Sequence, residues 1–173
     1  MALKTKPPAK SPAMTHRHAP QARVLIIEGR FYDAISDELV NGAIAALNAQ
    51  GAGYDRNSVP GALEIPQALA HAASAGLVPR GAASGRWDGA VALGCVIRGE
   101  TSHYDIVCNN ANHWLMEVAI RHGVPLGNGI LTVDTEAQAM VRARGGLDGK
   151  GGDAVRACLS LIELVRTFEG QSA

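Results

Sequence analysis

Apolar residues along the chain form short continuous runs that alternate with stretches at helical spacing. Continuous runs occupy residues 23–29, 89–97 and 125–133. A more polar run occupies residues 54–59 and is closed by Val59-Pro60-Gly61. Unbroken apolar runs of this length are typical of strands that are buried on both faces. The pattern therefore predicts four strands, of which the one at 54–59 is the most polar.

Helical spacing of apolar residues occurs between and after these runs. Asp33 can cap the first helix, and Thr101 or Ser102 can cap the third. The third helix should end at Gly123, because Pro125 prevents its continuation. The predicted helices cover residues 33–47, 62–76, a segment ending at 123, and residues 136–144 and 153–168.

This alternation of strands and helices predicts the fold class. It is typical of an α/β protein: a three-layer sandwich with four parallel strands and helices on both faces of the sheet. Right-handed crossovers leave few topologies for four strands. In such sheets the ligand lies beyond the carboxyl ends of the strands, where the strand order reverses.

The charge distribution separates the first 22 residues from the rest. Residues 1–22 carry four prolines and four basic residues but no acid, which predicts a flexible tail before one domain at 23–173. The domain keeps 12 of the 16 basic residues against all 16 acidic ones. A mildly acidic domain argues against nucleic-acid binding. No apolar run has the length of a membrane span, so no membrane partner is expected.

The cysteines and histidines suggest neither a disulfide framework nor a metal site. Cys95, Cys108 and Cys158 have no metal-ligand spacing, and their odd number gives no disulfide framework. The six histidines likewise form no metal-ligand cluster in the sequence. We therefore expect a cytoplasmic protein without a metal.

Three polar segments follow the first three predicted strands. They are Gly29–Asp33, Val59–Glu64 and Arg98–Asp105. Because the carboxyl ends of parallel strands lie at one edge of a sheet, these loops should converge. The amides of residues 99–102 would point outward from a helix N-terminus, which favours phosphate binding.

Each candidate side chain in these loops also has a purely structural interpretation. His103 could exchange protons with a substrate, or be a surface histidine near a helix start. Phe31 could stack on a heteroaromatic ring or cover the core, and Glu64 could bind hydroxyl groups or favour its helix dipole. Arg98 and Asp105 are expected to pair with each other rather than to act in catalysis.

Two glycine-containing nucleotide motifs can be excluded. The sequence RGGLDGKGG has the wrong spacing for a phosphate loop, and Gly151 stands where Ser or Thr is required. No G-x-G-x-x-G follows the first strand, which argues against a dinucleotide dehydrogenase.

Five ordered blocks resemble the 6,7-dimethyl-8-ribityllumazine synthase family between Val24 and Phe168. They are GRFYD, VPGALEIP, LGCVIRGETSHYDIVCN, GVPLGNGILTVDTEAQA and the region from Arg142 to Lys150. The resemblance implies a flavodoxin-like sheet and a transferase of riboflavin biosynthesis. The implied reaction condenses 5-amino-6-ribitylamino-uracil with 3,4-dihydroxy-2-butanone 4-phosphate, without a cofactor.

The resemblance also implies a pyrimidine half of the site. Phe31 would stack on the pyrimidinedione, and Glu64 with nearby amides would hold the ribityl chain. Residues implied in this half are Phe31, Ala62, Leu63, Glu64, Val96 and Ile97.

A phosphate half is implied by the same resemblance. Arg142 would bind phosphate with help from the backbone of Glu100 and Thr101, and Lys150 falls on a family lysine near the phosphate. His103 would carry protons in imine formation and phosphate elimination.

The family resemblance further implies a homopentamer, or a multiple of pentamers, with sites at subunit interfaces. Asn128 departs from the family pattern, since many members place there an aromatic residue that closes over the ligand from a neighbouring subunit. Two alternatives stay open: a noncatalytic flavin-binding or shell-forming relative, and a flavodoxin-like carrier of phosphorylated flavin. Both His103 and Arg142 are present, which favours the enzyme.

Overall fold

The sheet contains four parallel strands, as the sequence predicts. The structure is a computed structural model that describes residues 21–81 and 84–171. The strands are β1 (Arg23–Gly29), β2 (Gly53–Val59), β3 (Gly89–Ile97) and β4 (Leu126–Val133). They pair in the order β2-β1-β3-β4, and every pairing is parallel.

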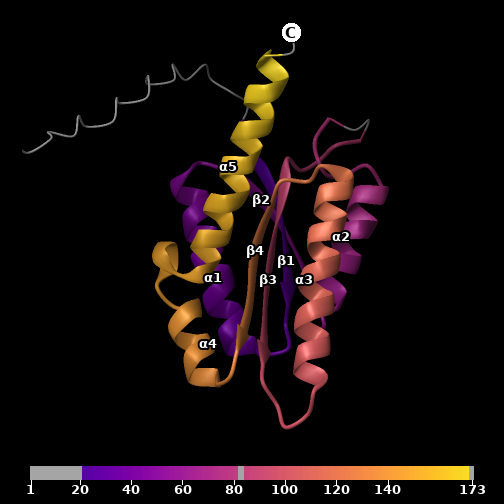
Figure 1. Cartoon of the computed structure of the whole chain (residues 1–173). Coiled ribbons are helices and arrows are strands. Elements are labelled where there is room, and N and C mark those ends of the chain that lie inside the picture. The colour runs from indigo at the N-terminus through magenta and orange to yellow at the C-terminus, as the bar shows by residue number, and fades with distance from the viewer. Residues whose placement is uncertain (1–20, 82–83, 172–173) are drawn as a thin grey trace, which may run out of the picture.

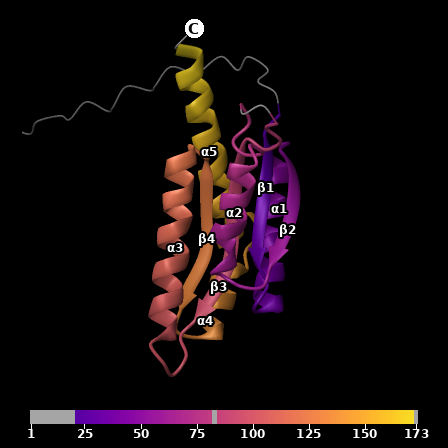
Figure 2. The same cartoon turned by 90° about the vertical axis from the view of Figure 1, so that its right-hand side faces the viewer.

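Helices cover both faces of this sheet (Figures 1 and 2). One layer contains α1 (Asp33–Ala49), α4 (Glu136–Ala143) and α5 (Lys150–Gln171), with a short 3-10 helix η1 (Gly146–Asp148) before α5. The other layer contains α2 (Glu64–Ser74) and α3 (His103–His122). The predicted three-layer α/β, flavodoxin-like fold is confirmed.

The central strands β1 and β3 separate two hydrophobic cores. Val24 and Ile26 of β1 point to the α1 and α5 side, whereas Leu25 and Ile27 point to the α2 and α3 side. β3 is almost fully buried, while β2 is an edge strand with three exposed residues. The two cores fix the position of β1 and β3, and their carboxyl ends carry the loops described below.

The helix ends agree with the sequence in part. Gly123 ends α3 in the left-handed conformation (φ 64°), as predicted. The expected capping of α1 by Asp33 is wrong, because Tyr32 is the N-cap residue and no side chain caps it. The Asp33 carboxylate instead accepts a hydrogen bond from Arg30 Nε (3.1 Å). An ion pair with the preceding loop has replaced the cap.

Helix α5 begins at Lys150, three residues before the predicted start at Asp153. The glycine-rich sequence before Asp153 is typical of a loop, but here the glycines allow close packing. A Cβ atom on Gly151 would lie 2.0 Å from the carbonyl oxygen of Leu39 on α1. Close packing of α5 on α1 therefore requires glycine inside the helix.

Gly127 of β4 permits a second close approach, and we expect Gly127→Ala to destabilise the fold. A Cβ atom there would lie 1.8 Å from the carbonyl oxygen of Ala154 on α5, so backbone must move. The expected loss is roughly 1–3 kcal/mol or more of unfolding free energy, measured by urea denaturation. Gly170→Ala, where a Cβ atom meets open space, is the control. Equal midpoints for both variants would contradict this packing argument.

The predicted tail and the expected lack of a membrane span can be compared with the structure only for the described residues. Residues 1–20 of the predicted tail lie outside the described residues. Of the residues that the structure describes, Gln21 and Ala22 precede β1. Of the helices that the structure describes, none combines the length and the apolar character that crossing a membrane would require.

Candidate functional site

The loops after β1, β2 and β3 meet where the strand order reverses. β2 extends the sheet on one side of the β1–β3 pair and β4 on the other. α1 leaves β1 toward one face, and α3 leaves β3 toward the opposite face, which opens a crevice between the two loops. The sequence places its candidate loops at this position.

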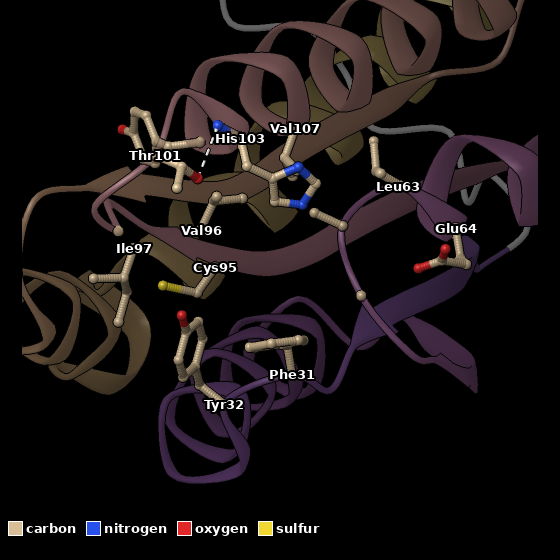
Figure 3. A pocket seen from close by; sticks show the side chains of 14 residues that line it. Phe31, Tyr32, Leu63, Glu64, Cys95, Val96, Ile97, Thr101, His103 and Val107 are labelled. Atoms are coloured by element: carbon tan, nitrogen blue, oxygen red, sulfur yellow. Dashed lines mark hydrogen bonds between the residues drawn. The ribbon is translucent and has the colours of Figure 1, made fainter.

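A cavity of about 280 Å³ occupies this crevice (Figure 3). Its walls are mostly apolar, with a few polar groups that converge from different loops, an arrangement typical of small-molecule sites. The lining residues are Phe31, Tyr32, Gly61, Ala62, Leu63, Glu64, Cys95, Val96, Ile97, Gly99, Thr101, His103, Tyr104 and Val107. Eight of the sequence-predicted site residues are therefore brought together.

His103 is the first residue of α3, and its imidazole lines the cavity. Its backbone N–H donates a long hydrogen bond to Thr101 Oγ1 (3.4 Å), which helps to start the helix. The side chain is exposed, and its ring points toward the centre of the cavity (Figure 3). An imidazole in this position can give or take a proton from a bound molecule.

Phe31 forms an aromatic wall opposite His103 (Figure 3). It is 71% exposed although it is a large apolar residue. Its ring packs edge to face on Tyr32, with 4.9 Å between centroids. A Cβ atom on Gly61 would meet Phe31 at 4.0 Å and the Glu64 carboxylate at 3.4 Å. The ring, the glycine and the carboxylate thus border one continuous surface.

Tyr32 and Cys95 bring a hydroxyl and a thiol to the same cavity. The tyrosine hydroxyl points toward the Cys95 sulfur (Figure 3). Burial raises the pKa of Tyr32 above its usual range. Burial, together with the nearby Cys108 thiol, raises the pKa of Cys95 to about 11. Both groups are therefore neutral at physiological pH.

Arg98 links the β3–α3 loop to the loop after β4. Its Nε atom donates to Asp134 Oδ1 (2.9 Å), and Nη1 lies 3.6 Å from Asp105 Oδ1. Its guanidinium also lies over the Tyr104 ring, 4.0 Å from the centroid. The predicted structural pairing of Arg98 with Asp105 is confirmed.

Arg142 and Lys150 lie in a second cavity, of about 440 Å³, beside β4. Arg144, Asp148 and Asp153 line the same cavity. The Arg142 guanidinium is exposed and donates to the carbonyl oxygen of Gln138 in its own helix (3.1 Å). Within one chain, the two basic residues are therefore not among those that surround His103.

Asn128 and Glu100 also lie outside the lining of the His103 cavity. Asn128 is on β4, where its Nδ2 donates to Asn112 Oδ1 (2.7 Å) and its Oδ1 accepts from Ile130 N (3.0 Å). Both its polar atoms are thus engaged within the chain. Glu100 is exposed in the loop between β3 and α3.

Five lining residues were not predicted from the sequence: Tyr32, Gly61, Cys95, Tyr104 and Val107; a sixth, Gly99, was expected only through its backbone amide. Simple rules would have found several of them. Val107 lies four residues after His103 and three after Tyr104, so it neighbours both on the helix surface, and Tyr32 follows Phe31 in the same loop. Cys95 carried no signal, because it is one more apolar position in a buried strand.

Within residues 21–81 and 84–171, no three His, Cys, Asp or Glu side chains are grouped so that they could hold a metal ion.

Comparison with known proteins gives one consistent result. The family model described as 6,7-dimethyl-8-ribityllumazine synthase matches residues 21–166. A protein of that name from Azorhizobium caulinodans is 54% identical over 145 residues, covering 84% of this chain and 87% of its own.

Two further relatives carry the same name. The protein from Methylobacterium radiotolerans is 52% identical, covering 86% of this chain and 85% of its own. The protein from Nitrobacter hamburgensis is 51% identical, with a coverage of 84% and 86%. Residues 21–166, which the family model matches, include all three loops that form the cavity.

Proposed function

The chain belongs to the 6,7-dimethyl-8-ribityllumazine synthase family of riboflavin biosynthesis, and from this premise we propose its substrates and the roles of its residues. It condenses 5-amino-6-ribitylamino-uracil with 3,4-dihydroxy-2-butanone 4-phosphate. The product is 6,7-dimethyl-8-ribityllumazine. Imine formation, phosphate elimination, ring closure and loss of water lead to it, without a cofactor.

One observation carries this proposal: the ring of Phe31 and the imidazole of His103 face one small, mostly apolar cavity from different loops. A planar pyrimidinedione fits against Phe31, and Val96 and Ile97 form the wall beside it. Glu64, with the amides near Ala62 and Leu63, lies where a ribityl chain would extend.

The chemistry assigned to His103 is proton transfer. Imine formation requires a proton for the departing hydroxyl group, and phosphate elimination requires removal of a proton from the bound intermediate. The protonated imidazole can give the first proton, and the neutral ring that results can take up the second. Holding two reactants in one cavity supplies much of the remaining acceleration, because it removes the entropic cost of their encounter.

The phosphate is assigned to Arg142, with Lys150 and the Glu100–Thr101 backbone as further contacts. Because Arg142 and His103 line different cavities of one chain, the proposal requires a second copy to bring them together. The same assembly would bring Asn128 to the ligand.

The outer surface of α3 supports self-association. Ile106, Trp114, Met116 and Ile120 are exposed on this helix, and Ile120 is 76% exposed. Apolar side chains gathered on one element are typical of protein interfaces. We assign this surface to a homopentamer or a multiple of pentamers, as in the family resemblance. The mass of the assembly in solution, measured by light scattering, tests this assignment.

We expect Arg142→Ala chiefly to raise the KM for the phosphorylated butanone. A guanidinium binds phosphate through two charged hydrogen bonds, and the loss of one costs roughly 1.5–3 kcal/mol, about 10- to 150-fold in affinity. Steady-state kinetics with each substrate varied in turn measures the effect. Arg86→Ala, which removes the same charge at an exposed residue outside both cavities, is the control. An equal rise of both KM values would contradict selective phosphate binding.

The enzyme proposal itself is tested by one preparation. Purified protein should be free of yellow cofactor and should form product, followed by absorbance, when both substrates are supplied. A copurified flavin without turnover would favour the binding-protein alternatives. A cytoplasmic location is part of the proposal, and the described cysteines, all free thiols, agree with a reducing compartment.

A further inference from the structure

One guanidinium joins the two ends of the loop that carries Phe31. Arg30 immediately precedes Phe31, and its side chain contacts three carboxylates. Nη1 lies 3.1 Å from Glu28 Oε2, and Nη2 lies 2.9 Å from both Asp33 Oδ1 and Asp37 Oδ1. Hydrogen bonds to Asp37 and to Glu28 raise the pKa of Arg30 above its usual range. Arg30 therefore links the end of β1 to the first two turns of α1 across Phe31 and Tyr32.

Phe31 needs such support, because its own packing is slight. It is 71% exposed, and its aromatic neighbour is Tyr32 in the same loop. Other hydrogen bonds hold the loop at its edges: Arg30 N donates to Val59 O and Ser36 N to Tyr32 O (both 2.9 Å), and the Ser36 hydroxyl donates to Gly29 O (3.1 Å). If the loop can adopt several orientations, only one of them presents the face of the ring to a ligand. Binding must then order the loop, which weakens the affinity for the ligand.

The anchor of this arrangement is the buried carboxylate of Glu28, which is 3% exposed. It has two partners: Arg30 on the cavity side, and Arg56 of β2, whose Nη2 and Nε lie 2.7 Å and 3.0 Å from Oε1. Either arginine can therefore be removed while the other still neutralises Glu28. Of the two arginines, Arg30 also contacts acidic residues of α1, whereas Arg56 lies on β2 within the sheet.

We propose that Arg30 is a positioning residue for the pyrimidine substrate: by linking Glu28 to Asp33 and Asp37, it holds Phe31 in the orientation that stacks on the ring. This inference rests on the proposed function. It predicts a selective effect, because Phe31 contacts the pyrimidine and not the phosphate. It also predicts that the charge alone is insufficient, since the ammonium group of lysine lacks the planar fork that reaches three carboxylates.

The test compares Arg30→Met with Arg56→Met in the full chain. Both variants remove one guanidinium from Glu28, but only the first releases the Phe31 loop. For Arg30→Met we expect the KM and the Kd for 5-amino-6-ribitylamino-uracil to rise roughly tenfold, with the KM for the phosphorylated butanone unchanged. Arg30→Lys should recover only part of this loss. Arg56→Met should leave both constants near their wild-type values.

Hydrogen–deuterium exchange without ligand gives a second readout, independent of turnover. Deuterium uptake in the peptide covering residues 30–36 should increase in Arg30→Met and not in Arg56→Met. Equal changes in both variants, or unchanged pyrimidine binding in Arg30→Met, would overturn the inference. If the wild-type chain itself does not bind the pyrimidine, the proposed function is at fault, and exchange alone decides whether Arg30 holds the loop.

Discussion

Replacing His103 by alanine is expected to lower the turnover number about a hundredfold or more, while the Kd for the pyrimidine stays near its wild-type value. Proton transfer by a positioned side chain typically contributes this factor. The stacking surface of Phe31 and the walls formed by Val96 and Ile97 stay in place. Saturating steady-state kinetics and calorimetric titration of the pyrimidine measure the two quantities separately.

His122→Ala provides the matched control for this experiment. His122 is an exposed histidine at the end of the same helix, and it is not among the residues that line the cavity. Its removal should leave the turnover number unchanged. A His103→Ala variant that turns over at the wild-type rate would remove this residue from the mechanism.

Mixing two inactive variants is expected to restore activity. In the proposed shared site, His103 comes from one subunit and Arg142 from its neighbour, so a His103→Ala subunit and an Arg142→Ala subunit each retain one half. Co-refolding equal amounts should give roughly one quarter of the wild-type sites, because each required subunit identity occurs with a probability of about one half. The recovered turnover, relative to refolded wild type, measures this fraction.

Two controls define the result of this mixing experiment. Preassembled variants mixed without refolding should show no recovery unless subunits exchange. A double variant, His103→Ala with Arg142→Ala, refolded with wild type, should also give about one quarter of the sites, since a site needs both neighbours intact. Absence of recovery after proven coassembly would place both residues in the site of one chain.

The strands and helices were predictable because burial dictates them. β1 is built on the apolar run Val24–Ile27 and β3 contains no polar side chain except the Cys95 thiol, and their positions agree with the sequence pattern. The start of α5 was not predictable from local pattern. Gly151 and Gly152 disfavour a helix in isolation, yet they allow α5 to pack against Leu39 and Leu147 at distances that no other residue permits. Tertiary packing there overrides local propensity.

Side-chain partners were harder to predict than elements. Asp33 has the right type and position for a helix cap, but Arg30 competes for its carboxylate from three residues before. The role of Arg98 was predicted correctly, since an arginine and an acid around a helix start tend to pair. The contact of Arg98 with Asp134 joins loops 36 residues apart, which no local pattern reveals.

Only the half of the candidate site that lies in the crevice was predictable from the sequence pattern. The topology rule for parallel sheets places Phe31, Glu64 and His103 at one crevice without reference to any relative. Arg142 and Lys150 lie beside β4 in a separate cavity, and their assignment to phosphate came from family resemblance alone. In the proposed shared site a second copy joins the two cavities, and no pattern within one chain encodes such a contact.

The sulfur at the floor of the cavity has a consequence for how the protein withstands oxidants and alkylating reagents. With a pKa of about 11, only about one Cys95 side chain in ten thousand is a thiolate at pH 7. Burial also raises the pKa of Cys108, and that of Cys158 to about 12. Because the thiolate is the nucleophile that attacks peroxide and iodoacetamide, these cysteines should react slowly with either reagent. The cavity thus keeps the small, polarisable surface of sulfur with little of its nucleophilic reactivity at neutral pH.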